Sequence, residues 1–223
     1  MKQSLLFIAA DPRECTGLLS HWDQVQPLQL PVHWARTGRW KGREVTAIAN
    51  GAGAERAFAA VLIAPKASAI CNIGFCGALD ESLQIGDIFV ATEIRNGANV
   101  WPACLPDTPD SPTGVVASID HIAQTAAEKS NLRASGASIV EMEAAGVARA
   151  SEDLDLPFYC IRAVSDLADE DFVSDFNAAL GPDGRFSIIS LAKQLNFGEL
   201  LRLKHRTELA SRKLGDFLAA TTF

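Results

Sequence analysis

Hydrophobic residues gather along this chain in short, unbroken runs. Five runs of strand length stand at 5–10, 45–50, 69–74, 87–94 and 158–165. Alanine-rich segments of helical length lie at 54–64, 118–129 and 141–153, and one last helix, or two, is expected at 198–220. Apolar strands without alternation are typical of a largely parallel sheet that helices cover on both faces. The pattern therefore predicts an α/β fold.

Two segments depart from this pattern. The stretch ARTGRWKGREVTAIA at 35–49 predicts an antiparallel hairpin with Gly42 at its turn, so the sheet is expected to be mixed. The stretch at 96–114 is rich in proline and predicts a long surface loop, of the kind that often carries function.

Composition narrows the class of protein. With 223 residues, of which 48% are hydrophobic, the chain is expected to form a single domain over residues 1–223. Its net charge of −7 disfavours a nucleic-acid partner. The first apolar run is too short for a signal peptide or a membrane span, and five scattered cysteines fit a reducing cytoplasm. The four histidines have no metal-ligand spacing, so we expect no metal.

Ligands of such sheets gather beyond the carboxyl ends of strands, which draws attention to the loops there. The first is NGAGAERA at 50–57, whose glycines expose backbone N–H groups to an anion or a ribose hydroxyl. Arg56 stands where a dinucleotide fingerprint needs its third glycine, so no nicotinamide or flavin cofactor is expected. A plain turn from strand to helix remains the alternative for Gly53 and its neighbours.

The second loop follows the strand at 69–74. Gly74 and Gly77 bracket Phe75 and Cys76, and such glycines let a backbone approach a ligand closely or simply form a tight turn. Nothing in the sequence places a base beside Cys76, so we interpret it as a small buried hydrophobic residue rather than as a nucleophile.

The third stretch is SIVEMEAAGVARA at 138–150. Glu141 and Glu143 are 200° apart on a helix, so they point to opposite sides. Glu143 shares a face with Val147 and Ala150 and is expected to point inward, whereas Glu141 is expected to reach solvent. A glutamate at a helix N-terminus is also favoured by roughly 0.3–1 kcal/mol, so a structural role remains open.

The fourth stretch, RAVSD at 162–166, ends a buried strand with Ser165 and Asp166. Taken alone, either residue could cap the helix that follows. Both stretches lie at sheet ends, however, and only one helix and one strand separate them. Together they predict one site that contains Glu143 and Asp166.

These motifs resemble one known family. VEMEA at 140–144 and RAVSD at 162–166, preceded by NIGFCGAL at 72–79 and IGD at 85–87, are similar to the nucleoside phosphorylase and nucleosidase superfamily. The resemblance implies a three-layer domain with a central mixed, partly barrel-like sheet flanked by helices. It also implies cleavage of the N-ribosyl bond of a purine nucleoside, without a cofactor but with phosphate as a candidate co-substrate.

A finer resemblance concerns the substrate. The stretches at 50–57, 115–132 and 181–189 are similar to the hopanoid-biosynthesis-associated phosphorylases, which remove adenine from an adenosylated hopanoid. A methylthioadenosine/S-adenosylhomocysteine nucleosidase remains an alternative. So does a protein that binds nucleosides on the same fold without catalysis, because fold does not fix function.

The resemblance also implies roles for single residues. Asp166, helped by Ser165, corresponds to the general acid that protonates the leaving purine at N7. Glu143 corresponds to the carboxylate that grips the ribose hydroxyls, and Met142 packs against the sugar. Glu14 aligns with the acid that orients the attacking water; a first-turn helix acid is its alternative.

Other positions carry or depart from the family pattern. Arg162 matches an arginine near the sugar, and Arg56 with Gly53 is our candidate for contacting phosphate. Phe75 replaces a small hydroxyl residue that touches phosphate or water, so the nucleophile stays open. His121 and Ile122 replace an aromatic and an aliphatic residue around the base.

The resemblance further implies a homo-oligomer, with a dimer favoured. The composition of two segments leads to a further hypothesis, a peripheral membrane contact. It would use Trp101 and Leu105 of the proline-rich loop and the leucines and basic residues at 200–206. An ordinary surface helix and loop are the alternative.

Overall fold

A computed structural model describes residues 4–187 and 194–223 of the chain. The strands are β1 (Leu5–Ala9), β2 (Asp23–Pro27), β3 (Trp34–Trp40), β4 (Arg43–Ala49), β5 (Ala69–Ala78), β6 (Ile88–Asn96), β7 (Asn99–Pro102), β8 (Thr113–Ser118), β9 (Ile139–Glu141) and β10 (Phe158–Asp166). The helices are α1 (Pro12–Leu19), α2 (Ala54–Leu62), α3 (Ala126–Ala134), α4 (Ala144–Asp153), α5 (Phe176–Ala179) and α7 (Phe197–Ala220). The last two residues of the motif at 181–189 lie outside the described residues.

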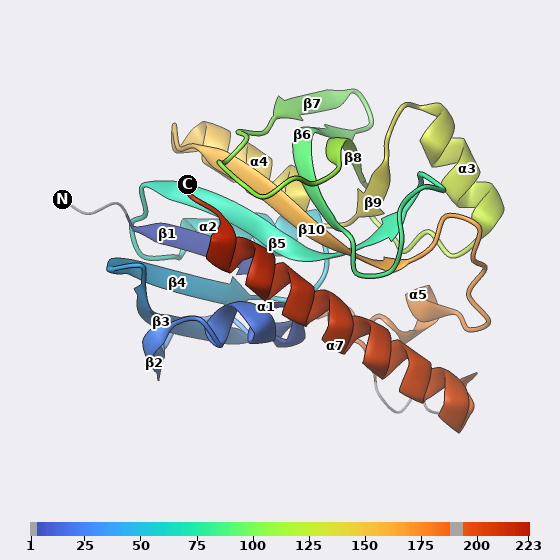
Figure 1. Cartoon of the computed structure of the whole chain (residues 1–223), viewed down its shortest axis with the longest axis horizontal. Helices are drawn as coiled ribbons and strands as arrows, with labels where there is room; N and C mark the ends of the chain where they lie inside the picture. Colours follow the sequence, from blue (N-terminus) through green and yellow to red (C-terminus); the bar gives the residue numbers. More distant parts are fainter. Residues whose placement is uncertain (1–3, 188–193) are drawn as a thin grey trace.

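One mixed sheet links all these strands and carries helices on its two sides (Figure 1). β1 pairs in parallel with both β4 and β5, and β5 pairs in parallel with β10. The strand β10 also pairs with β6, which is antiparallel to it. Strands β6, β8, β9 and β5 are then joined in turn, so that β5, β9, β8, β6 and β10 close a ring. The expected mixed, partly barrel-like α/β fold is confirmed.

The predicted hairpin is present between β3 and β4, which pair in antiparallel register. Its turn is formed by Lys41 and Gly42, both with positive φ, of 50° and 74°. Two residues in the left-handed region give the turn a twist that matches the strands on either side. Glycine adopts this conformation without strain, which explains why the sequence places one there.

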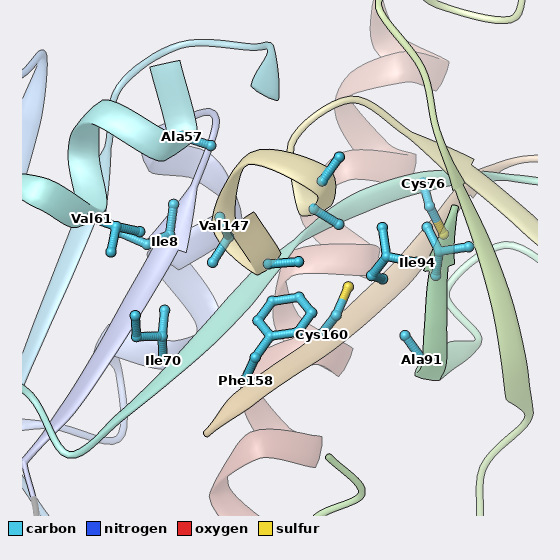
Figure 2. Close-up of a cluster of buried hydrophobic side chains, with 14 of the residues drawn as sticks. Ile8, Ala57, Val61, Ile70, Cys76, Ala91, Ile94, Val147, Phe158 and Cys160 are labelled. Carbon is cyan, nitrogen blue, oxygen red and sulfur yellow. The ribbon is translucent and has the colours of Figure 1, made fainter. Parts of the chain in front are cut away.

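The core fills both faces of the sheet, and α4 reaches it because of a single glycine. A Cβ atom at Gly146 would lie 1.8 Å from the carbonyl oxygen of Ala54 in α2, so only glycine allows the two helices to cross this closely. Figure 2 shows Val147 of α4 among Ile8 of β1 and Val61 of α2, all of them buried. This packing fixes the start of α4 at the edge of the sheet.

Helix α7 crosses α1 in the same way at its C-terminal half (Figure 1). A Cβ atom at Gly17 would meet the carbonyl oxygen of Ser211 at 2.0 Å, and Gly215 lies equally close to Gly17. The N-terminal half of α7 extends past the sheet and becomes one wall of the site. No helix within the described residues is both long and apolar enough to cross a membrane.

Three boundaries were predicted wrongly. The segment at 118–129 is not one helix: β8 ends at Ser118, and α3 begins only at Ala126, where Thr125 caps it. The segment at 96–114 is not a plain loop, since it contains β7 and the start of β8, both paired with β6. Residues 139–141 form β9, and the helix expected from 141 begins at Ala144. Such short strands contain too few residues to stand out in the sequence.

Candidate active site

A cavity of about 300 Å³ opens at the edge of the sheet where β1, β5, β9 and β10 end. Nine residues predicted from the sequence line it: Glu14, Phe75, Cys76, His121, Ile122, Met142, Glu143, Ser165 and Asp166. They come from five separate parts of the chain, and the sheet register brings them together. The cavity is therefore where the chemistry of the motifs is concentrated.

Glu14 stands in the first turn of α1 and is 5% exposed. Its Oε2 accepts hydrogen bonds from the backbone N–H groups of Ala10 and Asp11, at 2.8 and 2.9 Å. Its Oε1 accepts from the N–H of Phe75 at 2.8 Å, which ties α1 to β5. Burial raises the pKa of Glu14, and the nearby positive charge of Arg162 opposes this rise. The same residue thus closes a capping box and presents a carboxyl group to the cavity.

Glu141 was predicted to reach solvent, and this is wrong. It is 5% exposed, and its carboxylate accepts hydrogen bonds from the N–H groups of Glu143 and Ala144, at 2.9 Å each. It also forms an ion pair with Arg162, whose guanidinium donates to Asn72 as well. Glu141 ends a strand rather than beginning a helix, so the 200° argument does not apply to it. It satisfies the N-terminus of α4 in place of Glu143.

Glu143 points inward, as expected, but it does so as the residue preceding α4. It makes no side-chain cap; instead its Oε1 accepts from the N–H of Gly53 at 3.0 Å. Its Oε2 lies 3.6 Å from Nη1 of Arg162. Burial and the neighbouring charge of Glu141 raise the pKa of Glu143 to about 8. Because Glu141 completes the helix N-terminus, Glu143 is left to face the cavity.

Asp166 lies at the end of β10 with 13% of its side chain exposed. Its Oδ1 is 2.8 Å from the hydroxyl of Ser165, which is also 3.1 Å from the carbonyl oxygen of Cys76. Its Oδ2 accepts a hydrogen bond from the ammonium group of Lys129 at 2.7 Å. Asp166 therefore lines the same cavity as Glu143, with both of its oxygens held in place.

Lys129 is the side chain around Asp166 that sequence reasoning missed. It is fully buried, and within α3 it is the buried residue. In the sequence, AAEKSNLRA has the appearance of a solvated helix, and no periodic apolar face marks position 129. Only the packing of α3 against the end of β10 reveals its direction.

Cys76 and Phe75 form the floor beside Asp166. Burial raises the pKa of the Cys76 thiol well above its usual value, so the thiol keeps its proton. This agrees with the interpretation of Cys76 as a small buried side chain. Phe75 donates its backbone N–H to Glu14 and turns its ring to the cavity wall.

His121 and Ile122 lie on the segment between β8 and α3. The two ring nitrogens of His121 are 2.7 Å from Asp120 and 2.6 Å from Glu128. These hydrogen bonds, that of Asp120 first, raise the pKa of His121. Ile122 is held by Asn177 through two backbone contacts, of 2.8 and 3.0 Å. The segment is thereby fixed against α5.

Four predicted residues do not line the cavity. Arg162 is fully buried behind Glu141 and Glu143, and a Cβ atom at Gly74 would meet Nη1 of Arg162 at 2.4 Å. Gly74 thus gives room to Arg162 rather than to a ligand. Arg56 donates to the carbonyl oxygen of Pro182, and the N–H of Gly53 is used by Glu143. These positions do not support Arg56 and Gly53 as contacts for phosphate.

The opposite wall of the cavity carries a group of aromatic and aliphatic side chains, beside Glu199, Arg202 and Arg206 of α7. The rings of Phe172 and Phe176 are 4.9 Å apart, and those of Phe176 and Phe186 are 6.3 Å apart. Leu195 and Leu203, near the start of α7, continue this wall. The cavity therefore joins a carboxylate-rich side to an apolar side, an arrangement suited to a ligand that has one polar and one apolar part.

Within the described residues, no group of three or more His, Cys, Asp or Glu side chains is placed to hold a metal ion. Among the acidic side chains that line the cavity, Glu14, Glu143 and Asp166 come from the predicted motifs, and Glu143 and Asp166 are each backed by a buried cation. Such groups can transfer a proton, orient water and grip hydroxyl groups.

The chain is similar to known proteins in both sequence and structure. The family model of the phosphorylase superfamily matches residues 5–112 and 103–182. The 5′-methylthioadenosine/S-adenosylhomocysteine nucleosidase of Staphylococcus aureus (strain JH9) is 28% identical over 206 residues, covering 78% of this chain and 90% of the relative.

Solved structures of similar fold include two with different activities. One is the 5′-methylthioadenosine/S-adenosylhomocysteine nucleosidase of S. pneumoniae with a transition-state inhibitor, with a TM-score of 0.75, 20% identity and 97% of each chain covered. Another is a futalosine hydrolase mutant of Helicobacter pylori, with a TM-score of 0.74, 17% identity, and 98% of this chain and 97% of that one covered. At these identities the likeness concerns the fold.

Proposed function

Because the chain belongs to the phosphorylase superfamily, we propose that it is an enzyme that cleaves the N-ribosyl bond of a purine nucleoside, with adenine as the base. One observation carries the proposal. Glu14, Glu143 and Asp166, which are far apart in the sequence, present their carboxyl groups to one cavity at the end of the sheet. A nucleoside needs such groups at its base, its sugar and its attacking nucleophile.

Asp166 acts on the base. Breaking the bond expels a purine anion, which is a poor leaving group, and protonation at N7 removes this difficulty. A positioned acid of this kind contributes about 10²- to 10⁴-fold, or roughly 3 to 5 kcal/mol. The hydroxyl of Ser165, 2.8 Å from Asp166, keeps the carboxyl group oriented.

Glu143 acts on the sugar. Its carboxyl group forms hydrogen bonds with the ribose hydroxyls, and when ionised it favours the positive charge that grows on the ring. Met142, which is 9% exposed beside it, packs against the ribose. Arg162 does not touch the sugar in this arrangement; it holds Glu141 and Glu143 from behind.

Water is the nucleophile in our proposal, and Glu14 orients it. One arrangement supports water over phosphate: Arg56, the candidate for contacting phosphate, donates to the carbonyl oxygen of Pro182 and does not line the cavity. Burial raises the pKa of Glu14, which suits a group that accepts a proton from water.

The apolar wall points to a nucleoside with a large apolar 5′ substituent. An adenosylated hopanoid such as adenosylhopane has this character, and Phe176, Phe186 and Leu203 would cover its hydrocarbon part. A methylthioadenosine/S-adenosylhomocysteine nucleosidase is the second candidate, which the identity with the S. aureus enzyme favours.

The central experiment measures free adenine after incubation with adenosylhopane, methylthioadenosine, S-adenosylhomocysteine or adenosine, each with and without phosphate. Ribosyl products without phosphate esters indicate hydrolysis. Asp166→Asn should lower kcat at least about 100-fold, since it removes the acid. Asp169→Asn, an exposed neighbour, is the matched control. Unchanged release by Asp166→Asn would reject the assigned acid, and binding without release by the wild type would indicate a non-catalytic protein.

A second experiment tests the apolar substituent. Leu203 lines the cavity, whereas Leu201, two residues earlier on α7, is 56% exposed and does not. Leu203→Ala should raise KM for adenosylhopane about tenfold, since the lost burial is worth about 1.5 kcal/mol or more. It should leave KM for adenosine nearly unchanged, and Leu201→Ala should affect neither. Equal effects on both substrates would reject the assignment of this wall.

We also propose that the protein is a homodimer. A separate proposal is a peripheral membrane contact at the start of α7. Phe197 and Val173 are each 82% exposed near the cavity, and basic residues at 202–206 lie close by. Trp101 is not part of this surface, because it donates to Glu152 and β7 lies at the other side of the molecule (Figure 1). Co-sedimentation with anionic vesicles should be lost in Phe197→Ser; sedimentation velocity measures the number of subunits.

A further inference from the structure

A buried lysine stands directly behind the proposed acid, on a helix that otherwise faces solvent. Lys129 has no exposed surface, and it is the residue of α3 that is buried. Its Nζ donates to Oδ2 of Asp166 at 2.7 Å and to the carbonyl oxygen of Leu167 at 2.6 Å; the carbonyl oxygen of Glu170 is 3.5 Å away. The ring of Phe172 covers the ammonium group at 5.2 Å.

Stability alone does not account for this lysine. Taking an ammonium group out of water costs several kcal/mol, and well-packed apolar residues in place of a buried ion pair are often neutral or stabilising. An aliphatic residue at 129 would allow α3 to pack at lower cost. Unlike a lysine, an aliphatic residue could not place a transferable proton beside the proposed acid.

We propose that Lys129 is the positioning residue for Asp166 and the store of the proton that the leaving base receives. This rests on the proposed function. In the empty site the pair is an ammonium and a carboxylate. When the nucleoside excludes water, the charged groups lose their hydration. The neutral amine with the carboxylic acid then becomes comparable in free energy with the ion pair.

The proton movements balance. An N–H bond of Lys129 breaks as an O–H bond forms on Asp166. That O–H bond then breaks as N7 of the purine gains the proton, and the electron pair of the ribosyl bond moves onto the base. Asp166 ends as a carboxylate, and Lys129 regains a proton from water once the base has left.

Amines and carboxyl groups hold their protons over different ranges of pH. A lysine amine ordinarily holds its proton up to about pH 10, whereas a carboxyl group without such a neighbour loses it above about pH 4. The other ionisable groups that face the pair are Cys76 on β5, Glu170 and Asp171 on the segment after β10, and Arg206 on α7. Arg206 pairs with Glu170 at 2.7 Å, which leaves Lys129 as the cation on Asp166 among the described residues.

The test compares kcat of the wild type and Lys129→Met for adenine release between pH 6 and 8. The ratio of wild type to variant should exceed about 100 at pH 8 and shrink about tenfold per unit as the pH falls. The effect on kcat of titrating groups that both proteins share cancels in this ratio. KM should change less than threefold. Lys66→Met, an exposed lysine, should give a ratio of one throughout.

Two further variants serve as controls for this interpretation. Lys129→Gln keeps an N–H donor without a transferable proton, so it should behave as Lys129→Met does and serves if the latter fails to fold. In an Asp166→Asn background, Lys129→Met should cause less than a threefold further loss. A ratio independent of pH, or additive losses, overturns the inference while the proposed function stands. A wild type that releases no base overturns both.

Discussion

The two ends of the cavity both place a buried cation behind a carboxylate, but they use different cations. At the sugar end, Arg162 of the central strand β10 contacts Glu141 and Glu143 and also donates to Asn72. At the base end, Lys129 of the peripheral helix α3 contacts one carboxylate and two backbone carbonyls.

The difference follows from the side chains. The planar guanidinium offers five donors in a fixed fork and keeps its proton, so it suits a rigid framework of several acceptors. Burial opposes the charge of Arg162, yet Glu141, Cys160 and Glu143 raise the pKa of the guanidinium. An ammonium group is a compact charge that can give up its proton when buried. The arginine end therefore suits a fixed geometry, and the lysine end suits the proton exchange proposed above.

The largest effect should come from removing the cation of the sugar end. Arg162→Met leaves two glutamates buried without their partner, and breaking a buried pair in this way typically costs about 3–5 kcal/mol. Urea unfolding should show this loss, together with loss of binding. Arg43→Met, an arginine of strand β4 outside the cavity, is the control. A stable Arg162→Met protein would contradict the framework role.

The next effect concerns pH. The pKa of Glu143 rises from an ordinary 4.5 to about 8 in the folded protein, mainly through burial and the charge of Glu141. The native state thus holds a proton that the unfolded state loses above about pH 4.5. This contribution to stability is present in full below pH 4.5 and is lost as the pH rises to about 8.

In this window the free energy of unfolding should fall as the pH rises, by at most about 1.4 kcal/mol per pH unit for one proton. Glu143→Gln should remove that slope, whereas Glu55→Gln, at the surface of α2, should retain it. Urea unfolding at pH 5, 6, 7 and 8 provides the measurement. Identical slopes in wild type and Glu143→Gln would show that Glu143 does not hold this proton.

A smaller effect is expected from Ser165. Ser165→Ala removes one hydroxyl partner of Asp166 but leaves Lys129 in place, and a single hydrogen bond is worth about 1 kcal/mol. We expect kcat to fall about fivefold with little change in KM. Ser135→Ala, at the exposed end of α3, is the control. A loss as large as that of Asp166→Asn would mean that Ser165 itself transfers the proton.

The smallest effect should come from Cys76, although it lines the cavity beside Asp166. Burial keeps the thiol protonated, so it has no reactive anion to lose. Cys76→Ala should leave kcat within about twofold of the wild type. Its stability should fall slightly, because a small buried group is removed from the core. A hundredfold loss of activity would assign Cys76 a chemical role.

Much of this fold could be predicted from residue order. The hairpin at 35–49 follows from Gly42, and the strands at 69–74 and 158–165 follow from continuous apolar runs. Glu143 and Asp166 could be proposed for one site because both stretches were placed at sheet ends, and the family resemblance added Glu14. Short β8 and β9 could not be predicted, since three to six residues are too few to give a periodic signal.

The sequence by itself determined which segments are buried strands and which carboxylates follow them, because burial and strand ends are local properties of the chain. Only the tertiary structure decided that Glu141 faces Arg162 rather than solvent and that Lys129 reaches Asp166. The reason is electrostatic. A buried charge is acceptable only where an opposite charge arrives from elsewhere in the chain, and no local pattern specifies that partner.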